Sequence, residues 1–527
     1  MKTGAQKWWA LGALTLAVLA VGLDGTVLSV ALPTLATALK ATESDLQWFF
    51  SGYLLTLAAA MLPMGLLGDR FGRKKVLLIS LALFGVGSVV CAYSPNPTVF
   101  MAARAALGVA GAGIAVMAIS ALTVMFTPEE RPRAVGVWAA ANFLALPVGP
   151  ILGGWLLSNF WWGWVFLLNA PVALIGLLVG LVLLPESRAP VRPGLDILGI
   201  LLSTGGLVAL TYGLIEAGQN GWGDNSAVWP MVGGVVGLVL FFLWEGWLGN
   251  RPGGQPLVNL RLFRSRAFTW GVVLSALAGL SMIGALFTLP QFFQGVNGAD
   301  AMGSGERLLP LIGGLIVGAI PADRVAKLIS VKVTVALGFL VMGVAMLLGS
   351  TTTATSSVGF IALWMALSGF GLGFAMATAT STALSELSEE DAGVGSAVLQ
   401  ALQKTGAPFG SAALGSVLSA AYVSKLNLTG LPSAIASVVK QGLAEGLAVA
   451  AQLHSAALLD SVRSAFVYGM DVSLAVAAGI AGGGMLLALI FLPARRPASA
   501  SPAAPAVPGG DASAENQEQS IGISVGG

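Results

Sequence analysis

Three ionisable residues lie deep inside long apolar runs of the sequence: Asp24, Arg104 and Lys404. Asp24 is near the centre of the first run and is the only carboxylate placed so deep in any of them. Because an ionised acid is costly in an apolar phase, it needs a partner or a water-filled cavity. Apolar surroundings also favour the neutral acid, which allows proton uptake near physiological pH. We therefore expect Asp24 to hold either a proton or a cation, unless it only joins two helices by a hydrogen bond.

The two basic residues allow more than one interpretation. The Arg104 guanidinium can bind carbonyl oxygens or act on Asp24, either in coupling or as an anchor between helices. Lys404 is close to the middle of its run, near Gln400 and Gln403. It can pair with Asp24 and exchange partners, bind an anionic or zwitterionic ligand, or stay neutral with a structural hydrogen bond. All three alternatives remain open for Lys404.

The runs that contain these residues have the length of membrane spans. Of the 527 residues, 56% are hydrophobic and 9% charged, against about 25% charged in a typical soluble domain. A bilayer core about 30 Å thick is crossed by about 20 helical residues. The sequence therefore predicts an all-α integral membrane protein with 14 transmembrane helices, at residues 9–36, 46–67, 76–94, 98–125, 134–157, 163–184, 196–217, 228–249, 268–293, 307–323, 333–350, 358–385, 392–421 and 470–492.

Lys and Arg are distributed unevenly between the two sides of this arrangement. With the amino terminus inside, nineteen of the 26 lie inside and five outside, which predicts cytoplasmic termini and a cytoplasmic-membrane location. The first run is too long for a cleaved signal peptide, so we interpret it as a retained helix. An amphipathic stretch at 435–462, within the long outside loop 422–469, is expected to be helical at the membrane surface. Residues 494–527 are predicted to be a disordered cytoplasmic tail.

Composition excludes several other classes of protein. The net charge of +2 provides no basic field for nucleic acid. One cysteine, Cys91, and one histidine, His454, do not supply the usual metal or catalytic clusters, so we expect neither an enzyme nor a metal site. No phosphate-binding loop of the form G-x-x-x-x-G-K-[ST] occurs, so ATP is not implied. We expect no cofactor.

A charged motif follows the second run and returns in weaker form later. Residues 65–77 read G-L-L-G-D-R-F-G-R-K-K-V-L, and residues 319–328 read A-I-P-A-D-R-V-A-K-L, displaced by about 254 positions. Such a repeat predicts two six-helix halves with a pair of helices inserted between them. The predicted units are an amino-terminal bundle at 1–190, the inserted helices and linker at 191–266, and a carboxy-terminal bundle at 267–493.

The charged motif has the composition of a cytoplasmic gate. Asp69 can cap a neighbouring helix, and the basic residues can pair with acids across the two halves and fasten one conformation. The alternative is that the positive charges only set the topology. The candidate gating residues are Gly65, Asp69, Arg70, Gly72, Arg73 and Lys74.

Prolines and glycines cluster in the fifth run. Proline removes a backbone hydrogen bond, and glycine allows close approach of two helices. We expect either a pliable seam or a tight contact between the halves, with ordinary packing glycines as the alternative. The residues are Pro147, Gly149, Pro150, Gly153 and Gly154.

Together these motifs resemble those of the major facilitator superfamily. Residues 65–77 match its loop motif G-x-L-x-D-R-x-G-R-K-x-x-L, Arg104 opens an R-x-x-x-G motif similar to that of its fourth helix, and residues 149–154 match the G-P-x-x-G-G motif of its antiporters. The string W-V-F-L-L-N-A-P ending at Pro171, and L-D-G-T-V from Leu23, resemble motifs of its fourteen-span drug:proton antiporters.

This resemblance implies a major facilitator fold of two six-helix bundles plus two inserted helices, acting as a monomer. It implies proton-coupled export of hydrophobic, cationic drugs across the bilayer by alternating access, with Asp24, Arg104 and Lys404 as coupling residues. The alternative is an exporter dedicated to one antibiotic or natural product, including anionic or zwitterionic compounds, because Lys404 stands where some relatives carry acids.

The remaining candidates are expected to line a substrate cavity with apolar, aromatic and amide groups. Each of them, taken singly, is more often a packing residue. Glu43 and Asp45 in the first outside loop can attract cations, although solvated loop acids are the commoner explanation. The cavity candidates are Tyr53, Trp138, Asn142, Phe143, Gln291, Phe292, Gln294, Gln400 and Gln403.

Overall fold

The computed structural model describes residues 4–127, 130–188, 194, 196–385 and 392–493, and every regular element within these ranges is a helix. The predicted disordered tail at 494–527 lies outside them. In chain order the elements are α1 (Gly4–Leu39), α2 (Glu43–Phe71), α3 (Arg73–Ala92), α4 (Pro97–Met125), α5 (Arg131–Asn159), α6 (Trp164–Leu167), α7 (Asn169–Leu183), α8 (Ile197–Asn220), α9 (Asn225–Gly249), η1 (Leu260–Arg264), α10 (Arg266–Gln291), η2 (Phe292–Val296), α11 (Ala301–Arg307), α12 (Leu309–Leu328), α13 (Val331–Gly349), α14 (Val358–Ser385), α15 (Ala392–Lys425), α16 (Ser433–Val439), α17 (Leu443–Gln452) and α18 (Ala456–Phe491).

Polar capping residues fix where several of these helices begin. The Thr42 side chain accepts a hydrogen bond from the backbone N–H of Asp45, and the Asp45 carboxylate accepts from the backbone N–H of Thr42, 2.9 Å away. Asn96 caps α4, with Pro97 at its first position, and Asp300 caps α11. Such caps satisfy backbone N–H groups that have no partner inside the helix.

The lengths of the helices agree with membrane spans. Among the described residues, 12 helices are long and apolar enough to cross a membrane. Two more, α5 and α15, have 29 and 34 residues and coincide with predicted runs. Each predicted run therefore falls on a helix and the all-α architecture is confirmed, whereas the count of fourteen spans stays a prediction.

The two halves of the chain repeat one packing pattern. In the amino-terminal half (α1–α7), α4 packs on α2 and α3, α1 packs on α5 and α7, and α3 packs on α7. In the carboxy-terminal half (α10–α18), α14 packs on α12 and α13, α10 packs on α15 and α18, and α13 packs on α18. Each of these contacts in one half has a counterpart in the other, and α2 corresponds to α12. This agrees with the repeat of the charged motif at the ends of these two helices.

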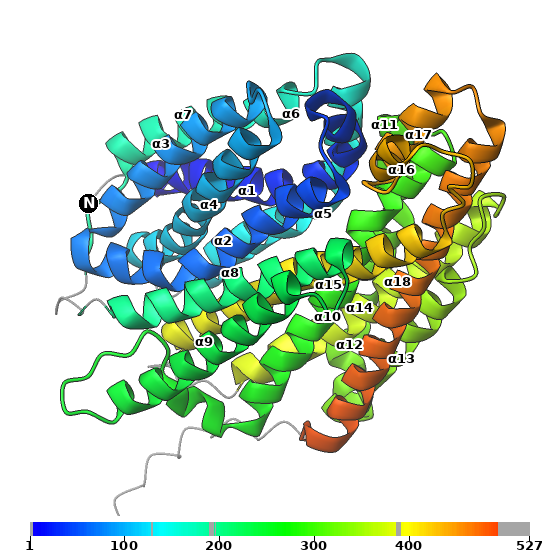
Figure 1. Cartoon of the computed structure of the whole chain (residues 1–527). Helices are drawn as coiled ribbons and strands as arrows, with labels where there is room; N and C mark the ends of the chain where they lie inside the picture. Colours follow the sequence, from blue (N-terminus) through cyan, green and yellow to red (C-terminus); the bar gives the residue numbers. More distant parts are fainter. Residues whose placement is uncertain (1–3, 128–129, 189–193, 195, 386–391, 494–527) are drawn as a thin grey trace, which may run out of the picture.

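The inserted helices α8 and α9 pack on each other, and α8 also packs on α2 and α15, one helix from each half. Glycines allow the close approach of this pair. A Cβ on Gly234 would lie 2.6 Å from the backbone nitrogen of Leu210. The helix α8 therefore lies along the line where α2 and α15 meet, and α9 packs on α8 (Figure 1).

The halves meet at the end of the molecule that holds α11, α16 and α17, at the upper right of Figure 1. We call this the outer end, because the distribution of Lys and Arg predicts that it faces outside. There α17 packs on α18 and η2 of one half and on α1 of the other. The prediction of a surface helix at 435–462 is therefore wrong in part. The stretch divides into α16, α17 and the start of α18, and α17 buries Leu443 and Ala450 between the halves.

Candidate functional site

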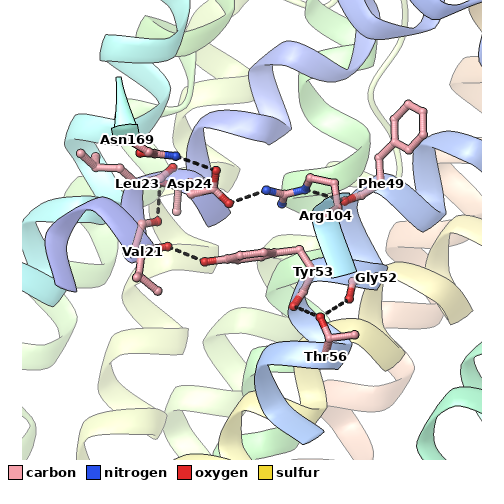
Figure 2. Close-up of polar contacts among 11 residues, drawn as sticks. Val21, Leu23, Asp24, Phe49, Gly52, Tyr53, Thr56, Arg104 and Asn169 are labelled. Atoms are coloured by element: carbon pink, nitrogen blue, oxygen red, sulfur yellow. Dashed lines mark hydrogen bonds and ion pairs between the residues drawn. The ribbon is translucent and has the colours of Figure 1, made fainter. Parts of the chain in front are cut away.

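A buried ion pair joins α1 and α4 in the amino-terminal half (Figure 2). Arg104 Nη1 donates to Asp24 Oδ2, and the side-chain amide of Asn169 on α7 donates to Asp24 Oδ1 over 3.0 Å. Both side chains of the ion pair are 1% exposed. Because each oxygen of the carboxylate has a donor, much of the cost of burying the two charges is offset.

The guanidinium is also held from α2. Arg104 Nε donates to the carbonyl of Phe49 over 3.2 Å, and the guanidinium carbon lies 4.2 Å from the centre of the Tyr53 ring. The Tyr53 hydroxyl in turn donates to the carbonyl of Val21 on α1, 2.8 Å away. A cation over an aromatic face is attracted to it, the more so without water. Four helices thus converge on one arginine (Figure 2).

The glycine that follows Arg104 by one turn makes this convergence possible. A Cβ on Gly108 would lie 2.9 Å from the backbone nitrogen of Leu57 on α2 and closer still to the carbonyl of Tyr53. Only glycine therefore lets α4 come close enough for Arg104 to reach the Phe49 carbonyl. This explains the spacing of the R-x-x-x-G motif.

These contacts decide between the interpretations of Asp24. Its partner is a protein group, Arg104, and neither Lys404 nor a wet cavity. The expectation that Asp24 holds a proton or a cation supplied through a water-filled cavity is not met in this conformation, because its side chain is 1% exposed and is bound by Arg104 and Asn169. Arg104 anchors helices here, and any coupling role requires the ion pair to open in another conformation.

Lys404 lies on α15 and is exposed. Two turns further along the helix, Ser411 Oγ is 2.6 Å from Ser51 Oγ of α2. Another turn on, a Cβ on Gly415 would lie 2.9 Å from the Gln47 side chain of α2. Because residues seven apart share a helix face, Lys404 lies on the face of α15 directed at the amino-terminal half.

Lys404 makes no hydrogen bond or ion pair with any residue that the structure describes. Two of its three interpretations, the pair with Asp24 and the structural hydrogen bond, are therefore absent from this conformation. Its neighbour Gln403 donates to Thr380 Oγ1 on α14 over 2.8 Å, and Gln400 is half-buried. Among the described residues no group occupies the amine, and the third interpretation, binding of an anionic or zwitterionic ligand, stays a prediction.

The charged motif folds back on its own half. Gly72 joins α2 to α3 with φ +118°, and a Cβ there would lie 2.6 Å from Glu186 Oε1, so only glycine fits. Arg73 pairs with Asp69 at 2.9 Å, and Lys74 Nζ donates to a backbone carbonyl of α7 over 2.8 Å. In this conformation Arg73 and Lys74 therefore have their partners within the amino-terminal half, and the binding of acids across the halves in another conformation stays a prediction.

Other positions of the motif have local neighbours. Gly65 faces Val116 of α4 at ordinary packing distance, and the Arg70 guanidinium lies 5.7 Å from the centre of the Phe71 ring. The gating role of Arg70 stays a prediction. In the weaker copy of the motif, Asp323 Oδ1 accepts from Ser381 Oγ of α14 over 3.0 Å.

Within the amino-terminal half, the glycines of α5 bring it against α1. A Cβ on Gly149 would lie 2.8 Å from Thr26 Cβ, and one on Gly153 would lie 2.7 Å from Val27 Cγ1. The Thr26 hydroxyl also donates to a backbone carbonyl of α5 over 3.0 Å. The side chain of Pro147 lies outside the described residues.

Between the halves, the same segment meets α11. A Cβ on Gly154 would lie 2.7 Å from the carbonyl oxygen of Ala301, and a Cβ on Gly305 would overlap the carbonyl oxygen of Pro150. The geometry therefore agrees with a tight contact between the halves at the outer end.

Several cavity candidates form other contacts. Tyr53, 1% exposed, belongs to the buried ion-pair site, so its place in a cavity wall is wrong for this conformation. Gln294 Nε2 donates to the Val30 carbonyl of α1 over 2.9 Å, and Gln291 Nε2 donates to Glu43 Oε1 over 3.2 Å. Both glutamines therefore connect the halves.

The aromatic candidates are mostly packed. Phe292 is fully buried, and Trp138 is half-buried against the apolar core of the amino-terminal half. The side chains of Asn142 and Phe143 lie outside the described residues, so their place in a cavity stays a prediction.

Sequence reasoning missed Asn169, Asp471 and the burial of Glu43. Asn169 stands alone as a polar residue in the string W-V-F-L-L-N-A-P, and that isolation was the available signal. Glu43, expected in a solvated loop, is 4% exposed. Asp471 falls well inside α18, because this helix begins at Ala456 instead of near residue 470.

The sequence profile of the Major Facilitator Superfamily matches residues 14–411. The chain belongs to the major facilitator superfamily. This major facilitator protein is 32% identical over 488 residues, 90% of each chain, to the tetracenomycin C resistance and export protein of Streptomyces glaucescens. It is also 32% identical over 490 residues to the multidrug efflux pump LfrA of Mycolicibacterium smegmatis, covering 90% of this chain and 94% of that one.

Its fold is similar to the crystal structure of a bacterial homolog of the human lysosomal transporter Spinster, in an inward-facing and unoccupied conformation. The TM-score is 0.66 with 16% sequence identity, covering 93% of this chain and 98% of that one. The family and the two relatives named above show that the chain is a multi-pass membrane transporter and not an enzyme.

Proposed function

We propose that this transporter exports hydrophobic drugs or antibiotics, driven by a proton gradient and without a cofactor. It acts as a monomer in the cytoplasmic membrane, with both termini in the cytoplasm. The observation that carries the proposal is 32% identity over nine-tenths of the chain to relatives named for export and efflux. The contacts between the halves at the outer end support alternating access, since they must separate for substrate to leave there.

The sealed ion pair suggests how proton entry depends on conformation. With the outer end closed, Asp24 is bound by Arg104 and Asn169, and its side chain is 1% exposed. Outer opening moves the two halves apart and lets a proton reach Asp24. A neutral Asp24 then releases Arg104, which changes the contacts of α1, α2 and α4. Proton uptake is thereby linked to the substrate-releasing state.

The charge of the substrate is a second question. Cationic compounds, which the sequence predicted, need an accessible acid, and Asp24 is inaccessible in this conformation. The exposed, unpaired Lys404 on the face between the halves favours the alternative, a dedicated exporter of anionic or zwitterionic natural products.

Inverted membrane vesicles with an acidified interior test the proposal. The wild type and Asp24→Asn are compared for gradient-driven uptake of a cationic dye, an anionic antibiotic and a zwitterionic antibiotic. We expect wild-type uptake of at least one compound to collapse with an uncoupler and Asp24→Asn to lose about 100-fold of the driven rate. Glu245→Gln, which changes a buried acid of the inserted helix α9, is the matched control. Undiminished driven transport by Asp24→Asn refutes its role.

A further inference from the structure

A second buried acid lies at the outer end, far from the Asp24 ion pair. Glu43 is the first residue of α2 and is 4% exposed. Its carboxylate accepts from Gln291 Nε2 of α10 over 3.2 Å, and its backbone N–H donates to the carbonyl of Gln441 over 2.9 Å. One residue of the amino-terminal half thus binds two separate segments of the carboxy-terminal half.

One of these segments is an outer lid, which we define as residues 433–452 with α16 and α17. The hydroxyl of Tyr422 on α15 fastens it by donating to the carbonyls of Val439 and Gly442, at 2.9 and 3.0 Å. Val439 is fully buried and Leu443 is 4% exposed. The outer lid therefore moves with the carboxy-terminal half, and separation of the halves must break the contacts of Glu43.

The outer lid brings a second carboxylate to Glu43. A Cβ on Gly442 would lie 2.9 Å from Glu445 Oε2 and 3.4 Å from Glu43 Oε2, so both acids flank the same backbone position. Glu445 is half-buried on α17. Burial and, to a smaller extent, the charge of Asp45 raise the pKa of the Glu445 carboxyl to about 7.

No cation compensates for these acids within the described residues. The groups that face Glu43 are an amide, a phenol and two carboxylates, and the nearest lysines in sequence are exposed and pair with neither acid. When two carboxylates share a buried space, at least one favours the protonated form. The groups around Glu43 and the two nearby lysines are, in chain order, Lys40, Asp45, Gln291, Tyr422, Lys440 and Glu445.

We infer that Glu43 and Glu445 form a proton-binding site whose occupancy closes the outer end. A proton on either acid removes the repulsion between the carboxylates and completes the contact of α2 with the outer lid. Loss of that proton drives the halves apart. This inference rests on the proposed function and deepens it. Protons from outside close the outer end after the substrate has left, which favours the return of the empty transporter. Closure itself can be measured without transport.

The direction of the pH effect follows from the two states. An acid with a higher pKa when closed binds more protons in the closed state, so closure is favoured at low pH. If the Glu445 carboxyl returns to its ordinary pKa of 4.5 on opening, closure weakens as pH rises from about 4.5 to about 7 and stays constant above it. The Glu445 carboxyl alone then lowers the closed-to-open ratio by about 300-fold.

Electron–electron distance measurements test this site on the full chain in lipid nanodiscs. Spin labels replace the exposed residues Thr98 on α4 and Ala354 between α13 and α14, in a Cys91→Ser background. We expect the long-distance, open population to grow between pH 4.5 and 7. Glu43→Gln imitates the protonated acid, so it should keep the short distance to pH 8.

The controls separate this site from general effects of pH. Glu306→Gln removes an exposed carboxylate of α11 at the same end and should titrate like the wild type. Wild-type distances that do not change with pH overturn the inference, as does wild-type titration in both Glu43→Gln and Glu445→Gln. The distance measurement uses no substrate and no gradient. A negative result in the vesicle uptake assay therefore does not affect it, and a negative result here does not affect the uptake assay.

Discussion

Replacing Asp24 by asparagine should destabilise the amino-terminal half by an amount that the ion-pair geometry allows us to estimate. The substituted side chain keeps the shape of the original and an oxygen for the Asn169 amide. The change removes the carboxylate bound to Arg104, whose guanidinium cannot lose its proton. Breaking one side of a buried pair typically costs about 3–5 kcal/mol.

The remaining contacts of Arg104 place the cost at the lower end of that range. The Phe49 carbonyl and the Tyr53 ring still bind the guanidinium, and a desolvated cation over an aromatic ring is worth about 2 kcal/mol. If the amino-terminal half loses about 3 kcal/mol of stability, the equilibrium constant for its opening rises about 150-fold. Arg104→Met should cost less, because Asp24 can become neutral by taking up a proton.

The chain contains a natural reporter for opening of the amino-terminal half. Cys91 on α3 is the only cysteine and is fully buried, so a thiol-reactive dye labels it only when the amino-terminal half opens. Labelling in detergent should be about 100-fold faster for Asp24→Asn than for the wild type. The double variant Asp24→Asn with Arg104→Met should label more slowly than Asp24→Asn alone. Wild-type labelling rates in Asp24→Asn refute the reasoning.

Two further predictions concern the contact between the halves. Lys404→Gln should reduce export of acidic compounds at least about 10-fold while neutral compounds are unaffected, and equal loss for both classes contradicts a charge-reading role. Gly305→Ala forces a Cβ onto the Pro150 carbonyl, so the outer-end spin labels should shift to longer distances, whereas Gly479→Ala, which has open space, should not change them. Unchanged distances in Gly305→Ala exclude α11 from outer closure.

The helices were predictable because the length of an apolar run decides whether it can form a membrane-spanning helix. Each apolar run became a helix, and the motif repeat anticipated the repeated packing of the halves. The start of α18 was missed because its first turns carry Asp460 and Arg463, which a search for apolar residues excludes. Ser455 caps this helix, and a capping signal without apolar flanks is too common to place a boundary.

The sequence predicted which residues are functional candidates, but it did not predict which of them form the buried ion pair. Depth in an apolar run identified Asp24, Arg104 and Lys404, since such residues are costly unless they have a function or a partner. The sequence did not show which base meets the acid, because that depends on the rotation and crossing of helices about 80 and 380 residues away. Gly108 and Asn169 decide it, through close approach and a second donor.

The helix α2 links the two buried acid sites mechanically. It begins with Glu43 at the outer end and carries the Phe49 carbonyl and the Tyr53 ring that hold Arg104, within about 15 Å along the helix axis. Ser51, on the same segment, contacts α15. Because a helix without a break between these residues moves as a rigid element, a shift of α2 against α1 and α4 on release of Glu43 from the outer lid would also displace the groups that bind the guanidinium. On the proposed function, opening of the outer end and loosening of the Asp24 ion pair are then one movement, and a proton reaches Asp24 only when the exit is open.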